Sequence, residues 1–179
     1  MKTILEYLST KVTQTKIKAT DETIGQIIKD ELDRLGHDAD LNHIDVSEVT
    51  YMNNLFSCVS MDLGEKYNDL NPDISNWDVS NVESMQWMFW KCKNFNCDIS
   101  QWNVSKVKYT KGMFWFCESF NQDISEWDVR NVIDMSGMFW GCENFNQDLS
   151  KWNVSNVKDH DYMFDDCPIK EEFKPHFIN

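Results

Sequence analysis

A four-residue core recurs along the chain: tryptophan, then aspartate or asparagine, then valine, then serine or arginine. Its tryptophans are Trp77, Trp102, Trp127 and Trp152, so each copy follows the previous one by 25 residues. A fixed period of this length is typical of repeat arrays, in which each unit buries its apolar residues against its neighbours. The period therefore favours a stacked fold over one that encloses a catalytic cleft.

Two shorter periodicities run within each repeat. The last three residues of the segment 74–79 alternate between apolar and polar side chains, which indicates a short strand. Such strands from successive repeats would form a parallel sheet. Residues 85–92 carry Met85, Met88, Phe89 and Cys92 at steps of three, one and three, as on one face of a helical turn. The sequence thus predicts an α/β solenoid built from short parallel strands and short helices.

The prediction divides the chain into three parts. Residues 1–36 form an N-terminal helical cap, with one amphipathic helix that begins after Thr20 and ends at Gly36 and another short helix at residues 4–13. Residues 37–169 hold about five repeats, the first of which has Ile44 in place of tryptophan and an eight-residue insertion around residues 58–71. Residues 170–179 form a C-terminal cap or tail.

Charge and apolar runs limit the kinds of partner. The formal net charge is −13, and all of the excess lies in residues 37–179 because residues 1–36 hold six basic and six acidic side chains. Phosphate contacts need a basic face, so we expect no nucleic-acid binding. We expect no membrane insertion either, since no apolar run reaches spanning length. The N-terminus does not resemble a signal peptide, which predicts a chain that stays in the cytoplasm, leaves by another route or has been trimmed.

Catalytic and metal-binding motifs are not visible. The four histidines share no motif spacing, so the sequence predicts no enzyme, no catalytic residues and no cofactor. Cysteines recur in a single column, which favours tight packing over zinc or redox chemistry. We predict no metal site among them. The members of this column are Cys92, Cys117, Cys142 and Cys167.

Two sets of tryptophans lead to different predictions. The Trp77 column alternates with valine and is expected to be buried. Trp90, Trp115 and Trp140 point away from the apolar stripe if residues 85–92 are helical, and with Trp87, Phe116 and Tyr162 they would form an exposed aromatic strip. Such a strip would bind a partner or mediate self-association. The alternative is that the turn is not helical and that the rings fold down between repeats.

The outward positions of the predicted strands form the other candidate surface. On a stacked sheet they would line one face, where a protein or a glycan could bind. The Asp and Asn members could instead bind calcium through their oxygens, or simply solvate the sheet. The candidate partner-binding residues here are Asn76, Asp78, Gln101, Asn103, Glu126, Asp128, Arg130, Lys151 and Asn153.

The repeat resembles a known bacterial family. Isoleucine, tryptophan and valine at Ile74, Trp77 and Val79 are spaced as in leucine-rich repeats, and Met88-Phe89-x-x-Cys92 is similar to the helix of their BspA-type branch. The 25-residue unit looks like that of BspA-like and mycoplasma lipoprotein-like surface proteins over residues 40–169. The resemblance implies a right-handed leucine-rich-repeat-like stack on the bacterial cell surface.

The same resemblance implies an adhesion or protein-binding role. The leading hypothesis is a non-enzymatic module that recognises a protein, or a glycan, through its concave sheet or its aromatic strip. The alternative is a structural component of a surface layer or virion, encoded by a phage or another mobile element, that assembles through Trp90, Trp115 and Trp140.

Overall fold

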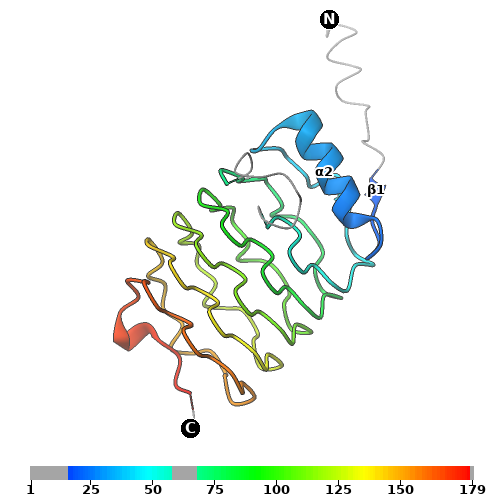
Figure 1. The fold of residues 1–179 in the computed structure, drawn as a ribbon. Coiled ribbons are helices and arrows are strands. Elements are labelled where there is room, and N and C mark those ends of the chain that lie inside the picture. The colour runs from blue at the N-terminus through cyan, green and yellow to red at the C-terminus, as the bar shows by residue number, and fades with distance from the viewer. Residues whose placement is uncertain (1–15, 58–67, 178–179) are drawn as a thin grey trace, which may run out of the picture.

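The computed structural model describes residues 16–57 and 68–177. It contains strand β1 (Ile17–Lys18), helix α2 (Ile24–Leu35), strand β2 (Ile44–Asp45) and the 3-10 helix η2 (Glu171–Phe173). β1 and β2 pair in parallel, with Ile17 opposite Ile44. The repeats lie side by side between α2 at one end and η2 at the other (Figure 1). The helix predicted at residues 4–13 and part of the predicted insertion fall outside the described residues.

Helix α2 confirms the amphipathic helix that the sequence predicts before Gly36. Ile24, Ile28 and Leu32 are buried on one face, against the N-terminal end of the repeats. Gly36 ends the helix with a φ of 95°, and its N–H donates to the Leu32 carbonyl at 2.9 Å. Within the described residues, no helix is long and apolar enough to cross a membrane.

The predicted α/β solenoid, a leucine-rich-repeat-like right-handed stack of short parallel strands and short helices, is wrong. Within residues 68–170 the repeats contain neither a strand nor a helix and consist of turns and irregular chain. In the described repeats, β-type pairing between neighbours is limited to isolated parallel bridges, such as those from Ser84 to Tyr109 and from Tyr109 to Asp134. The face described as a concave sheet therefore does not exist as a sheet.

The predicted strand at residues 74–79 is broken by aspartate side chains. The Asp73 carboxylate accepts hydrogen bonds from the Ser75 amide at 3.1 Å and from the Ser75 hydroxyl at 2.7 Å. The Asp78 carboxylate accepts from the Ser80 amide in the same way, at 3.1 Å. Between them, the Trp77 amide closes a turn onto the Ile74 carbonyl. Aspartate side chains that bond the backbone two residues later bend the chain, so no extended run forms.

The predicted helix at residues 85–92 is broken by left-handed backbone. Trp87 has a φ of 58° and Lys91 a φ of 63°, whereas a right-handed helix needs negative φ throughout. The amides of Met88 and Trp90 close three-residue turns onto the carbonyls of Met85 and Trp87. The same two positions recur with positive φ in the later repeats, at Gly112, Phe116, Gly137, Gly141, Tyr162 and Asp166.

Each repeat bonds to the next through what we call the linking segments, residues 85–91 and their copies 110–116, 135–141 and 160–166. Every second amide of a linking segment donates to a carbonyl of the following repeat. Met85 donates to Tyr109 at 2.9 Å and Trp87 donates to Lys111 at 2.9 Å. These peptide groups all share one orientation, with the N–H toward the C-terminal end of the stack and the C=O toward the N-terminal end.

Stacked phenylalanines form the centre of the core. Neighbouring rings of one column lie 5.5–5.7 Å apart and nearly parallel. Four of the five are fully buried, and Phe164 of the last repeat is half-buried. Such contacts join consecutive repeats into one continuous apolar column. Its members are Phe56, Phe89, Phe114, Phe139 and Phe164.

The structure confirms the burial of the Trp77 column. Trp102 and Trp127 are 4% and 5% exposed, and their indole N–H groups donate to the carbonyls of Ile74 and Ile99 in the preceding repeat, at 3.3 and 3.1 Å. A buried indole N–H needs a partner, and here that partner fixes the spacing between repeats.

The cysteine column packs as predicted. Cys92, Cys117 and Cys142 are fully buried, and the Cys142 thiol donates to the Phe114 carbonyl at 3.0 Å. Burial raises the pKa of the Cys142 thiol well above its ordinary value. A thiol held in its protonated form is a weak nucleophile, which fits a packing role.

The aspartates that break the strands predict a loss of stability in acid. Hydrogen bonds from the amide and hydroxyl of Ser125 lower the pKa of Asp123 below its ordinary value. The contribution is therefore present above the unfolded pKa of about 3.9 and is lost as the pH falls through the folded pKa. Asp123→Asn keeps an acceptor oxygen but cannot titrate, so its urea unfolding midpoint should fall less than that of the wild type between pH 6 and pH 3.

Asp38→Asn, an exposed substitution outside the aspartate–serine turns of the repeats, is the matched control for the change in net charge. It should follow the pH dependence of the wild type. Identical acid sensitivity in Asp123→Asn and the wild type would contradict the role assigned to the aspartate turns.

Candidate functional site

The outward residues proposed from the sequence are mostly exposed, but they do not lie on a sheet. Asn76, Asp78, Gln101, Asn103, Glu126, Arg130, Lys151 and Asn153 are exposed, and Asp128 is half-buried. The Asp and Asn members use their side-chain oxygens locally. Asn103 accepts from the Ser105 amide at 3.2 Å, and Asp128 accepts from the Arg130 side chain at 2.7 Å. These oxygens therefore stabilise turns within each repeat.

The calcium alternative has no further support from the arrangement of acidic groups. Across residues 16–57 and 68–177, no group of three or more His, Cys, Asp or Glu side chains is placed to hold a metal ion. Along this column aspartates alternate with asparagines, in the order Asp78, Asn103, Asp128 and Asn153. Carboxylates are therefore separated by neutral amides.

The second set of tryptophans forms a stack that we call the aromatic ladder, comprising Trp87, Trp90, Trp115, Trp140 and Tyr162. The ring centroid of Trp115 lies 4.9 Å from that of Trp87 and 4.4 Å from that of Trp140. The centroids of Trp140 and Tyr162 are 5.6 Å apart, and all three pairs are stacked. The tryptophans are half-buried, and Tyr162 is 63% exposed. The rings thus fold onto one another across the repeats and still leave one edge of the ladder open to solvent.

A groove of about 290 Å³ opens along the C-terminal half of this ladder. Gly137 lines it, and a Cβ built there would lie in van der Waals contact with the Trp115 ring, 3.6 Å from Cε3. Asp159, Asp161 and Lys111 bring charged side chains to the same groove. We call this the aromatic groove; Trp115, Ser136, Trp140 and Tyr162 complete its lining.

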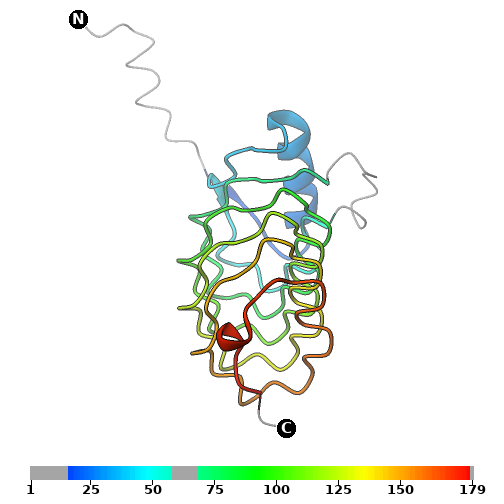
Figure 2. The ribbon, with the colours of Figure 1, turned by 90° about the vertical axis from the view of Figure 1, so that its left-hand side faces the viewer.

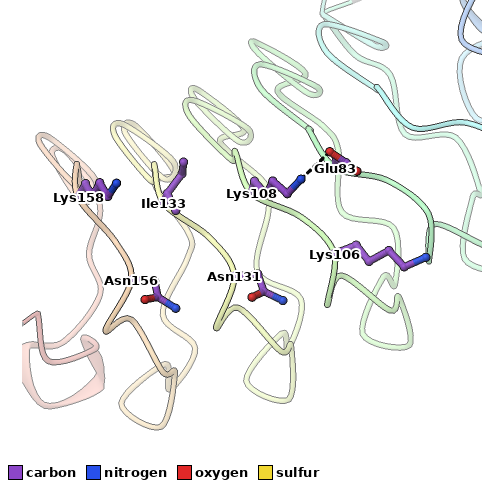
Figure 3. A pocket seen from close by; sticks show the side chains of 7 residues that line it. All are labelled: Glu83, Lys106, Lys108, Asn131, Ile133, Asn156 and Lys158. Carbon is purple, nitrogen blue, oxygen red and sulfur yellow. Dashed lines mark hydrogen bonds and ion pairs between the residues drawn. The ribbon is translucent and has the colours of Figure 1, made fainter.

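A larger and shallower groove of about 550 Å³ lies on another part of the surface, and sequence analysis missed it. Figure 3 shows its two rows of side chains, one with Lys108, Ile133 and Lys158 and the other with Lys106, Asn131 and Asn156. We call it the lysine groove. The available signal was the pair of positions on either side of the valine that follows each four-residue core, as in Lys106-Val107-Lys108, where lysines gather in an otherwise acidic chain.

Much of the charge in the lysine groove is already compensated. Lys108 forms an ion pair with Glu83 at 2.8 Å, and Lys106 donates to the Asn81 side chain at 2.6 Å. The amides of Asn131 and Asn156 donate to carbonyls of the preceding repeat. These side chains therefore link repeats to one another. Within the described part of the chain, Lys158 is the groove's lysine whose amine forms no hydrogen bond or ion pair.

The fold and these grooves define a tandem-repeat protein with solvent-open surface sites. Residues 60–175 match the family described as Mycoplasma protein of unknown function, DUF285, and the chain belongs to that family. No curated protein and no solved structure gives a significant match. The finer resemblance to BspA-like surface repeats, with its implied display at the cell surface, stays a prediction.

Proposed function

We propose that the chain is a non-enzymatic protein-binding module and that the aromatic ladder is its contact surface. The observation that carries the proposal is the open edge of stacked rings from Trp115 to Tyr162, beside a groove flanked by Asp159 and Asp161. Half-exposed aromatic rings held rigid by stacking lose little entropy when a partner covers them. Tryptophan and tyrosine accordingly dominate the binding energy of many interfaces.

The two other surfaces support binding less well. Lysine is depleted from interface centres, and in the lysine groove Lys106 and Lys108 already have partners within the chain. The Asn and Asp side chains of the outward column are committed to local turns. The BspA-like resemblance adds an expectation of adhesion to host proteins or, as the alternative, to a glycan.

A capture experiment with matched variants tests the proposal. Immobilised wild-type protein, Trp140→Ala and Asn153→Ala would be incubated with the same extracts. We expect proteins retained by the wild type to be lost with Trp140→Ala and kept with Asn153→Ala, because Asn153 lies on the outward column and not on the ladder. If the retained proteins were lost with Asn153→Ala and kept with Trp140→Ala, the outward column would be the binding surface instead of the ladder.

The structural-assembly alternative predicts a different result. If the chain assembles through the ladder, size-exclusion chromatography with light scattering over a range of concentrations would show an oligomer that the substitution Trp115→Ala dissociates. A protein that stays monomeric over that range supports the binding module instead. Circular dichroism of each variant would verify that the fold survives the loss of a half-buried ring.

A further inference from the structure

Among the residues that the structure describes, the last linking segment ends the stack with a row of backbone amides that have no hydrogen-bond acceptor. In the preceding copy, Met135 donates to the Asp159 carbonyl at 2.8 Å and Phe139 to the Met163 carbonyl at 2.9 Å. No repeat follows residues 160–166 in the described chain to accept in the same way. Over residues 16–57 and 68–177, the amides of His160, Tyr162, Phe164 and Asp166 have no acceptor.

This row also ends columns of aligned peptide groups. The linking segments orient every second peptide identically, so their dipoles add along the stack as they do along a helix. The N–H groups of the last segment therefore lie at the positive end of several hydrogen-bonded columns. Aligned donors of this kind attract oxygen acceptors more strongly than isolated amides do.

The two ends of the stack are closed differently. At the N-terminal end α2 lies over the first repeat, and the Asp21 carboxylate accepts from the amides of Thr50 and Tyr51 at 2.7 and 3.0 Å. At the C-terminal end the tail, residues 170–177, bonds to a part of the repeat outside the linking segments, where the Leu149 amide donates to the Phe173 carbonyl. This hydrogen bond does not use the amides of the last linking segment, and the C-terminal end of the stack faces the viewer in Figure 2.

A groove of about 310 Å³ lies between the amide row and this tail. His160, Tyr162 and Phe164 form one side, and Lys174 and Phe177 form the other. The His160 ring stacks on Phe177 at 3.9 Å. An unpaired row of amides along an open groove is the arrangement by which sheet edges capture an added chain.

We propose that this edge binds an extended, basic segment of a partner protein, which accepts hydrogen bonds from the amide row. Within the stack the corresponding acceptors are two residues apart, as at Tyr109, Lys111 and Met113, and an extended chain likewise presents every second residue on the same side. This inference rests on the proposed function, that the chain binds proteins, and names the chemistry of the partner.

Charge supports a basic segment. Exposed aspartates flank the row, and the whole chain carries a net charge of −13. The amine of Lys174, the lysine that lines the groove, is paired with Glu171 at 2.7 Å. Lysine or arginine side chains of the segment would meet carboxylates on one side and the exposed ring of Tyr162 on the other. The flanking carboxylates are those of Asp159, Asp161, Asp165 and Asp166.

Fluorescence anisotropy with a defined peptide tests the proposal. The probe is a fluorescein-labelled ten-residue peptide of alternating lysine and threonine, and the control peptide has glutamate in place of lysine. His160→Pro removes one amide donor, whereas His160→Ala removes the same ring and keeps the amide. We expect His160→Pro to bind the lysine peptide about tenfold more weakly than His160→Ala, as for one hydrogen bond to an aligned donor.

Several results would overturn the inference. Equal affinities of His160→Pro and His160→Ala, with both folded by circular dichroism, would exclude pairing at the edge. Equal binding of the glutamate peptide would exclude a basic partner. An oligomer of the protein that His160→Pro dissolves would show that a second copy occupies the edge. Loss of cellular partners with Trp140→Ala but not with His160→Pro would leave the proposed function standing and overturn this inference alone.

Discussion

Replacing Phe114 with alanine is expected to lower the free energy of unfolding by about 3–5 kcal/mol. Phe114 is fully buried in the middle of the phenylalanine column, with ring centroids 5.6 Å from Phe89 and 5.7 Å from Phe139. A second ring, Phe120, lies 4.1 Å away. Its removal would open a cavity between three repeats whose backbones are tied together by hydrogen bonds and cannot collapse to fill it.

Urea denaturation followed by circular dichroism measures this effect. Tyr162→Ala is the matched control, because it also removes an aromatic ring from the stack but one that is 63% exposed. It should change the free energy of unfolding by no more than about 1 kcal/mol. If Phe114→Ala proved no more destabilising than Tyr162→Ala, the phenylalanine column would not be the source of stability assigned to it.

Gly112→Ala is expected to destabilise the protein by about 2–4 kcal/mol, through two effects. Gly112 has a φ of 58°, in the left-handed region that disfavours a side chain. An added Cβ would also lie 2.2 Å from Cε3 of Trp87, so the indole would have to move and would break its stacking with Trp115. The melting temperature and the urea midpoint should both fall.

Gly137→Ala separates the two effects. Gly137 is the same position one repeat later, with a φ of 60°, but its nearest ring atom would be 3.6 Å from the new Cβ. It should therefore cost only the left-handed backbone penalty, about 1 kcal/mol. Equal losses in the two variants would show that backbone strain alone matters. In a Trp87→Gly background, Gly112→Ala should cost less than it does in the wild type, because the ring that clashes with the new Cβ is absent. This double-mutant cycle isolates the clash, since the two positions are in contact.

Several features of the fold could be predicted from residue patterns because apolar side chains avoid water at regular intervals. The 25-residue period, the burial of Trp77 and its copies, the packing of Cys92 and its copies, and the helix from Ile24 to Leu35 are of this kind. Each depends on which positions are apolar, and that is visible in one dimension.

The backbone of the repeats could not be predicted in this way. Steps of three, one and three fit a helix, but they fit equally well a series of turns in which Trp87 and Lys91 adopt positive φ. The glycines at Gly112, Gly137 and Gly141 were a signal against a helix, since glycine is unfavourable in helix interiors. Likewise, Asp73 and Asp78 five residues apart pointed to turns where a strand was predicted.

The sequence by itself determined the period, the buried columns and the acidic surface, and it singled out Trp90, Trp115 and Trp140. Only the tertiary structure showed that these rings stack across repeats and that lysines two repeats apart share a groove. It also showed that four amides end the stack without acceptors among the described residues. The physical reason is that hydrophobicity fixes which side chains are buried. The direction of each peptide group depends on backbone angles, which are decided by contacts between repeats.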